Sequence, residues 1–181
     1  MKEFIRFILR GILAVSVSMI VVVGIMYIHL EHFSTMARDK RVHKMYENIL
    51  AKSGQAQDGL PLYILVGTEE NAYNDGKQVV IYTGLLDSLN DDEIAFVLGH
   101  EIAHGMLEHL GKLQANSADE SAVHEANADK LGAVYALKAG YDVCKGREVF
   151  KHWENERGNA LGQTHPDYAY RYSELNINCG E

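Results

Sequence analysis

Two histidines and a glutamate occur within five consecutive residues, His100-Glu101-Ile102-Ala103-His104. Residues four apart on a helix lie on one face, so His100 and His104 can bind one zinc ion together. Glu101 then lies beside the open side of the metal. There it can take a proton from the bound water and pass it to a leaving amine. The spacing predicts a hydrolase with one zinc ion per chain, and the alternative is a buried helix whose histidines only hydrogen-bond within the core.

The residues before this motif are typical of the start of a helix. Three carboxylates, at positions 91 to 93, suit the positive end of a helix dipole. Apolar residues recur at three- and four-residue intervals, at Ile94, Val97, Leu98, Ile102 and Leu107. We therefore expect the motif on a mostly buried helix, where an unpaired glutamate would be costly without a function.

A catalytic zinc site needs a third protein ligand and one open position. The pattern H-E-x-x-H-x-x-G-x-x-H would supply a third histidine six residues after the second, but this chain has Leu107 and Leu110 at the two diagnostic positions. His109 lies off the ligand face and is interpreted as a residue near the end of the helix. The third ligand must therefore come from elsewhere in the chain.

A second predicted helix, residues 117–139, supplies a carboxylate. Glu125 and Asp129 share a face, so Glu125 can bind the metal while Asp129 accepts the free ring N–H of a ligating histidine. His124 is the competing ligand, about a quarter-turn away from Glu125. An ordinary solvated acidic face is the alternative in a chain of net charge −8. Small residues would let this helix pack closely against the first, namely Ala122, Ala126, Ala128, Gly132 and Ala133.

The remaining elements predict an α+β domain that is mainly helical. Residues 34–53 and 142–156 have helical apolar periodicity. Alternating apolar residues at 62, 64 and 66, and an Asn74-Asp75-Gly76 turn signal before residues 78–82, predict strands. We expect a small antiparallel sheet that flanks the metal helix and that offers an edge to an extended substrate.

The N-terminal residues 11–30 are almost wholly apolar and long enough to cross a bilayer as one helix. Lys2, Arg6 and Arg10 precede them and favour a cytoplasmic N-terminus. Basic residues from Arg38 to Lys44 favour the opposite orientation. We predict a single-pass anchor, residues 1–33, in a bacterial inner membrane, with residues 34–181 as a periplasmic domain. A cleaved signal peptide and a buried core helix are the alternatives.

The composition supports one domain and excludes one class of partner. Of the 181 residues, about 150 remain beyond the anchor, enough for a sizeable core. The acidic balance and the absence of a basic stripe argue against nucleic acid. Cys144 and Cys179 are the only cysteines and lack a metal-binding spacing. They could pair in the periplasm, whereas in the cytosol both would remain thiols. Nothing in the sequence specifies an oligomeric state.

Several sequence blocks between about residues 60 and 175 resemble those of a known family and occur in the same order. They are Asn71-Ala72-Tyr73, the apolar run 79–82, Thr83-Gly84-Leu85-Leu86, the histidine motif, the segment from Glu125 to Asp129 followed by Ala139-Gly140-Tyr141-Asp142, and Thr164-His165-Pro166 with Arg171. This series is similar to the zinc metallopeptidases that include HtpX and the CAAX prenyl proteases, within the gluzincin group. The resemblance implies a zincin-like domain, in a short form with a single anchor.

The resemblance also implies roles for individual residues. His100, His104 and Glu125 would be the zinc ligands, Glu101 the general acid and base, and Asp129 the partner of a ligating histidine. His165 and Arg171 would lie near the cleft; His165 could assist the substrate oxygen or gate the metal, or Pro166 could make this segment a helix cap.

Two functional classes fit the sequence. The first is a zinc endopeptidase that acts on polypeptide substrates, with a role in envelope protein quality control. The second is a non-catalytic, zinc-stabilised chaperone or regulator that keeps the peptidase fold. Glu101 favours the first class, because an inactive relative has little reason to retain a carboxylate beside the metal-bound water.

Overall fold

The computed structural model describes residues 1–54, 59–107, 118–157, 167–175 and 177–179, without the side chains of residues 3, 7–15, 30–37, 118–120 and 157. The chain divides into two compact units, residues 1–42 and residues 43–181. All the candidate site residues belong to the second unit.

Helix α1, Lys2–Ser53, is continuous over 52 residues. The sequence predicts an apolar helix and a separate helix from residue 34, but no glycine or proline lies between them to end the first. Apolar side chains from Val17 to Ile28 are exposed. In the part of the chain that the structure describes, no helix meets the length and hydropathy of a membrane span.

The last turns of α1 belong to the core of the second unit. Met45, Tyr46 and Ile49 are buried there. The Tyr46 hydroxyl donates a hydrogen bond of 2.7 Å to the carbonyl of Leu60, and the Asn48 amide donates one of 2.9 Å to the carbonyl of Ala139. These contacts tie the end of α1 to the segment before β1 and to the residue that follows α4.

Three short strands form a mixed sheet in the order β1-β3-β2. They are β1 (Leu62–Leu65), β2 (Ala72–Asn74) and β3 (Val79–Tyr82). β2 and β3 form the expected antiparallel hairpin, and Gly76 takes a positive φ of 83° in its turn. The expectation of a wholly antiparallel sheet is wrong, because β1 pairs with β3 in parallel. The hairpin places β2 along one edge of β3, so β1 pairs along the other edge. The alternation of apolar residues in β1 would be the same for parallel and antiparallel pairing, so it does not reveal the direction of the strand.

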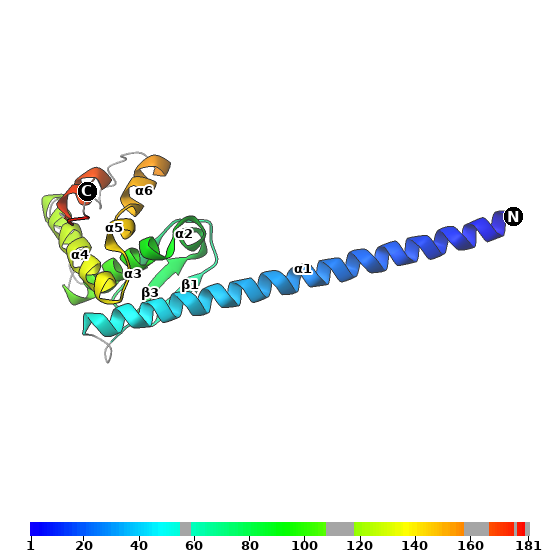
Figure 1. The fold of residues 1–181 in the computed structure, drawn as a ribbon, viewed down its shortest axis with the longest axis horizontal. Coiled ribbons are helices and arrows are strands. Elements are labelled where there is room, and N and C mark those ends of the chain that lie inside the picture. Colours follow the sequence, from blue (N-terminus) through cyan, green and yellow to red (C-terminus); the bar gives the residue numbers. More distant parts are fainter. Residues whose placement is uncertain (55–58, 108–117, 158–166, 176, 180–181) are drawn as a thin grey trace. The chain divides into compact units, whose positions relative to one another are not determined.

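Helix α3, Asp91–Met106, is the central element of this unit, and it follows the short helix α2, Thr83–Ser88 (Figure 1). Asn90 and Glu93 form a capping box at its start, which fixes where the helix begins. Every residue from Glu93 to Ala103 is buried. Since α3 contacts both β2 and helix α4, Ala118–Lys138, it lies between the sheet and α4.

The two long helices of the domain touch through their backbones. A Cβ atom added at Gly99 would lie 2.5 Å from the carbonyl oxygen of Gly132, and one added at Gly132 would lie 2.5 Å from the backbone nitrogen of His100. Only glycine at both positions allows this approach. The small residues predicted for this face of α4 therefore include one, Gly132, that sets the separation of the helices at the site.

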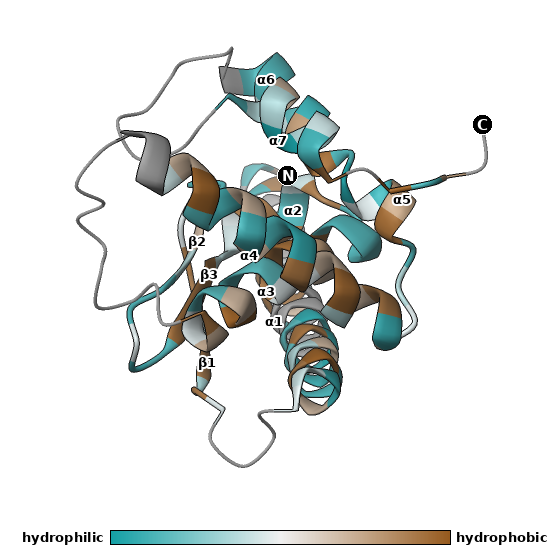
Figure 2. Cartoon of the chain, turned by 90° about the vertical axis from the view of Figure 1, so that its left-hand side faces the viewer, coloured by the Kyte–Doolittle hydropathy of each residue, from teal (hydrophilic) through white to brown (hydrophobic). Residues whose placement is uncertain are grey.

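Three short helices complete the domain: α5 (Val143–Gly146), α6 (Val149–Arg157) and α7 (Tyr168–Glu174). The sequence predicts one helix over residues 142–156. Instead, the backbone hydrogen bonds from Glu148 to Lys145 and from Phe150 to Arg147 span three residues and separate α5 from α6. Figure 2 shows α6 and α7 as mostly hydrophilic, in contrast to the hydrophobic β3. Cys144 and Cys179 form a disulfide with a Cα separation of 5.7 Å, which joins α5 to the segment after α7.

Candidate metal centre

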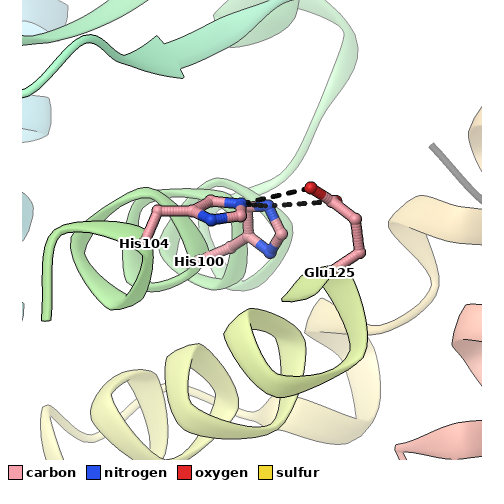
Figure 3. Close-up of side chains that lie close together, drawn as sticks. All are labelled: His100, His104 and Glu125. Atoms are coloured by element: carbon pink, nitrogen blue, oxygen red, sulfur yellow. Dashed lines mark hydrogen bonds and ion pairs between the residues drawn. The ribbon is translucent and has the colours of Figure 1, made fainter. Parts of the chain in front are cut away.

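Helices α3 and α4 bring two histidines and one glutamate together (Figure 3). The Nε2 atoms of His100 and His104 are 2.9 Å apart. One carboxylate oxygen of Glu125 lies 3.6 Å from Nε2 of His100, and the other lies 3.3 Å from Nε2 of His104. One candidate ligand atom from each residue lies within 4.8 Å of the others. This group could hold a metal ion.

The spacing of these atoms fits a zinc ion. Ligands at about 2.1 Å in a tetrahedral arrangement lie about 3.4 Å from one another. The three separations given above, 2.9, 3.3 and 3.6 Å, bracket that value. Two imidazole nitrogens and one carboxylate also match the donor set of catalytic zinc sites that leave a fourth position open. The residues present therefore fit zinc in both chemistry and size.

Asp129 and Arg171 form a buried network behind His100. Asp129 Oδ1 lies 2.8 Å from His100 Nδ1. Arg171 donates to Asp129 from Nε at 2.8 Å and from Nη2 at 2.6 Å, which is bidentate geometry. Its Nη1 lies 3.2 Å from Glu125 Oε2. Arg171, which comes from α7, thus contacts both Glu125 and Asp129 of α4 and stacks over the Phe150 ring at 4.7 Å.

The charges in this network determine which ring nitrogen of His100 carries the hydrogen and which keeps a lone pair for the metal. Burial opposes the ionisation of Asp129, but the charge and hydrogen bonds of Arg171 outweigh it and hold the pKa of Asp129 below its usual range. An ionised carboxylate can only accept a hydrogen bond, so Nδ1 of His100 carries the hydrogen. The lone pair of Nε2 is then directed at His104 and Glu125, as a metal ligand requires.

The same network also shifts the pKa of His100 and of Arg171. Burial lowers the pKa of His100, but the hydrogen bond and the charge of Asp129 outweigh it, so the pKa is raised overall. Burial also acts against the charge of Arg171, and the adjacent Asp129 outweighs it, so the pKa of Arg171 is raised and the guanidinium remains charged. Arg171 therefore offsets the negative charge that Glu125 and Asp129 bring into the protein interior.

Glu101 lines a pocket beside His100. Its side chain is buried, with 8% of its surface exposed, and it lines the pocket together with His100, Phe96 and Ala72. Among the described residues, no hydrogen bond or ion pair of its carboxylate is present. The backbone carbonyl of Glu101 accepts a hydrogen bond of 2.8 Å from the Asn74 amide, which fixes the end of β2 against α3. The carboxylate thus faces a space that a substrate can enter.

The sequence analysis also named residues outside this group of three as candidates near the site. His124 is not part of the metal-binding group found among the described residues. His165 and His109 lie outside the described residues, and the role that the resemblance implies for His165 stays a prediction. Helix α7 begins at Tyr168 with Asp167 as its N-cap. Pro166, the possible helix cap, also lies outside the described residues.

Two residues that position α3 escaped the sequence analysis. Asn74 was read only as part of a turn, and its bond to the carbonyl of Glu101 spans 27 positions, for which the local sequence carries no signal. Asn90 has a readable signal, since Asn90-x-x-Glu93 is the spacing of a capping box.

A helical domain with a candidate metal centre on two helices, beside a buried glutamate and a pocket, is the architecture of a metallopeptidase. The family model for peptidase family M48 matches residues 36–123. This range includes β1 to β3 and the whole of α3, and it ends two residues before Glu125. This match and the similarity to HtpX-type relatives support the assignment of the chain to peptidase family M48.

Individual relatives match different lengths of the chain. A protease HtpX homolog of Desulfatibacillum aliphaticivorans is 31% identical over 140 residues, 65% of this chain and 45% of that protein. The metalloprotease LoiP of Escherichia coli is 30% identical over 90 residues, 50% of this chain and 34% of that protein. The mitochondrial metalloendopeptidase OMA1 of Bos taurus is 58% identical over 36 residues, 19% of this chain and 7% of that protein. The chain thus spans less than half the length of each of these relatives.

Proposed function

We propose that this protein is a zinc-dependent endopeptidase that hydrolyses peptide bonds within protein substrates. The observation that carries the proposal is the group of His100, His104 and Glu125, of which His100 and Glu125 are buried, next to a glutamate that faces a pocket. The names of the relatives, which include a protease HtpX homolog and the metalloprotease LoiP, support the same activity.

In this proposal His100, His104 and Glu125 hold the zinc ion. When bound, zinc supplies a Lewis acid that lowers the pKa of a coordinated water and polarises the substrate carbonyl. Asp129 orients His100 through the hydrogen bond at Nδ1, and Arg171 holds Asp129 and Glu125 in place. The ligand geometry is thereby set by a network that spans α3, α4 and α7.

Glu101 is the general base and then the general acid. Its carboxylate accepts a proton from the attacking water as the new C–O bond forms at the peptide carbonyl carbon. The same proton passes to the amide nitrogen as the C–N bond breaks, so the leaving group departs as an amine. Burial beside His100 keeps competing water away and holds the carboxylate close to the reacting groups.

The substrate backbone binds along β2. This strand lies at an edge of the sheet, paired with β3. Asn71 and Ala72, at its start, line the same pocket as Glu101. An extended polypeptide that adds to this edge would place a peptide bond beside the metal centre through main-chain hydrogen bonds. This mode suits unfolded protein segments, which present an extended backbone.

We also propose that residues 11–30 anchor the protein in a bacterial inner membrane, with residues 34–181 on the periplasmic side. The apolar composition of this segment and the exposed apolar side chains from Val17 to Ile28 support the anchor. The basic residues Lys2, Arg6 and Arg10 support the orientation. A membrane-bound peptidase for unfolded chains would serve envelope protein quality control.

The activity is tested by incubating the full chain with an unfolded model polypeptide, with and without a metal chelator. We expect cleavage that the chelator abolishes and added zinc restores. Glu101→Gln should bind zinc and fail to cleave, because glutamine cannot accept the proton. Binding of the polypeptide without cleavage by the zinc-loaded wild type would contradict the proposal and favour a non-catalytic chaperone.

The topology is tested separately with a reporter fused after Glu181. We expect reporter activity on the periplasmic side and retention of the intact chain in membranes after carbonate washing. Activity restricted to the cytoplasm would overturn the orientation. A soluble mature chain that begins near Arg38 would show that the apolar segment is a cleaved signal peptide.

A further inference from the structure

The pocket beside Glu101 has an aromatic wall. Phe96 of α3, Trp153 of α6 and Tyr168 of α7 all line it. The Trp153 and Tyr168 rings are 5.7 Å apart, and Trp153 also packs against Phe150 at 6.3 Å. Phe150 in turn packs edge-on against Phe96 at 5.5 Å. These mutual contacts form a preorganised apolar surface beside the candidate metal centre.

The pocket also contains a carboxylate that the proposed mechanism does not use. Glu70, in the segment before β2, lines it, and its side chain is 23% exposed. One of its oxygens lies 3.2 Å from Nε2 of His152 on α6. A carboxylate has about four lone-pair sites, so the contact with His152 does not by itself exclude a donor from a ligand.

Among the described residues that line the pocket, the one arginine or lysine is already paired with protein carboxylates. Arg171 makes two hydrogen bonds to Asp129 and an ion pair with Glu125. Apart from the proposed zinc ion, a substrate carboxylate would therefore meet Glu70 and Glu101, and the described residues that line the pocket offer it no positive side chain that is not already paired. An acidic substrate side chain is disfavoured, and a basic one is favoured.

We propose that this pocket binds a lysine or arginine side chain of the substrate residue next to the cleaved peptide bond, with Glu70 as the specificity-determining residue. The aliphatic stem lies on Trp153 and Tyr168, whose ring faces also attract the cation, and the charged end pairs with Glu70. Since His100 and Glu101 line the same pocket, its occupant belongs to a residue that flanks the reacting bond. This inference rests on the proposed endopeptidase function and names its substrate class.

The test uses the full, zinc-loaded chain and quenched fluorescent peptides that differ at one position, scanned across the cleavage site. The position carries lysine, norleucine or glutamate. Norleucine keeps the aliphatic stem of lysine and lacks its charge, so the ratio of kcat/KM for the two peptides reports the charge alone. We expect lysine to exceed norleucine by about tenfold at one position adjacent to the cleaved bond, and glutamate to be the poorest.

Three variants assign the preference to Glu70. In Glu70→Gln the lysine to norleucine ratio should fall well below the wild-type value, leaving only the attraction of the cation to the aromatic rings. Glu69→Gln removes the same charge from a neighbouring exposed residue and should keep the ratio. His152→Gln removes the partner of Glu70 and should also keep it. If His152→Gln lowers the lysine to norleucine ratio as much as Glu70→Gln does, the proposal is overturned, because Glu70 would then act only by holding α6.

The wild-type comparison needs no variant, so the inference can be refuted even where Glu70→Gln fails to fold. Cleavage of the lysine and norleucine peptides at equal rates at every position would overturn this inference and leave the endopeptidase function intact. If the zinc-loaded wild type cleaves none of the peptides and no unfolded polypeptide, the proposed function itself fails, and this inference fails with it.

Discussion

Replacing Asp129 with asparagine should destabilise the protein and weaken zinc binding at the same time. Asp129 is 1% exposed, accepts two hydrogen bonds from Arg171 at 2.6 and 2.8 Å, and accepts one from His100 at 2.8 Å. Breaking a buried ion pair from one side costs about 3–5 kcal/mol. Glu125 still lies 3.2 Å from the guanidinium, so we expect about 3 kcal/mol, the lower end of that range.

The effect on zinc follows from the hydrogen bond to His100. Loss of a partner that orients a ligating histidine typically lowers metal affinity by about 10- to 100-fold. Unfolding by urea in the presence of chelator, followed by the fluorescence of Trp153, the only tryptophan, measures stability without metal. Competition with a chromophoric chelator measures zinc affinity in the same preparation.

A matched control is available on the surface of the same two helices. Glu174→Gln breaks an ion pair with Lys130, also from α7 to α4, in which both side chains are more than 40% exposed. It should cost less than about 1 kcal/mol and leave zinc binding unchanged. If Asp129→Asn were as stable as this control and bound zinc as tightly as the wild type, the role of the buried network would be refuted.

Two further predictions concern packing and the disulfide. Gly132→Ala should cost about 1–3 kcal/mol in urea unfolding, because its Cβ would lie 2.5 Å from the backbone nitrogen of His100; Gly24→Ala, whose Cβ meets nothing within 4 Å, is the control and should not destabilise. Replacing both Cys144 and Cys179 with serine should lower stability by roughly 3–4 kcal/mol, since the bond closes a loop of 35 residues. An unchanged unfolding midpoint in either case would contradict the corresponding contact.

The parts of the fold that the sequence predicts are those set by local periodicity. The sequence predicts a helix over residues 117–139, and helix α4 occupies Ala118–Lys138. The prediction is close because a helical face repeats within four residues, which a local pattern can show. The same rule puts His100 and His104 on one face of α3, and the turn signal before Gln78 marks the β2–β3 hairpin. These features depend on neighbours in the chain.

The parts that the sequence does not reveal depend on contacts between distant residues. The parallel pairing of β1 with β3 follows from which edge of β3 the hairpin leaves open. Arg171 is implied near the cleft by resemblance, but its simultaneous contact with Glu125 and Asp129 depends on how α7 packs on α4. The pair between Glu70 and His152 joins residues 82 positions apart. No periodic pattern encodes any of these three contacts.

The central claim is that one set of residues binds zinc and a different residue moves the proton. The most direct test measures zinc content and peptide cleavage on the same samples of the wild type, Glu101→Gln and Glu125→Gln. We predict that Glu101→Gln retains zinc and loses about 10²- to 10⁴-fold in cleavage rate, whereas Glu125→Gln loses zinc. Undiminished cleavage by zinc-loaded Glu101→Gln, or full zinc content in Glu125→Gln, would contradict the claim.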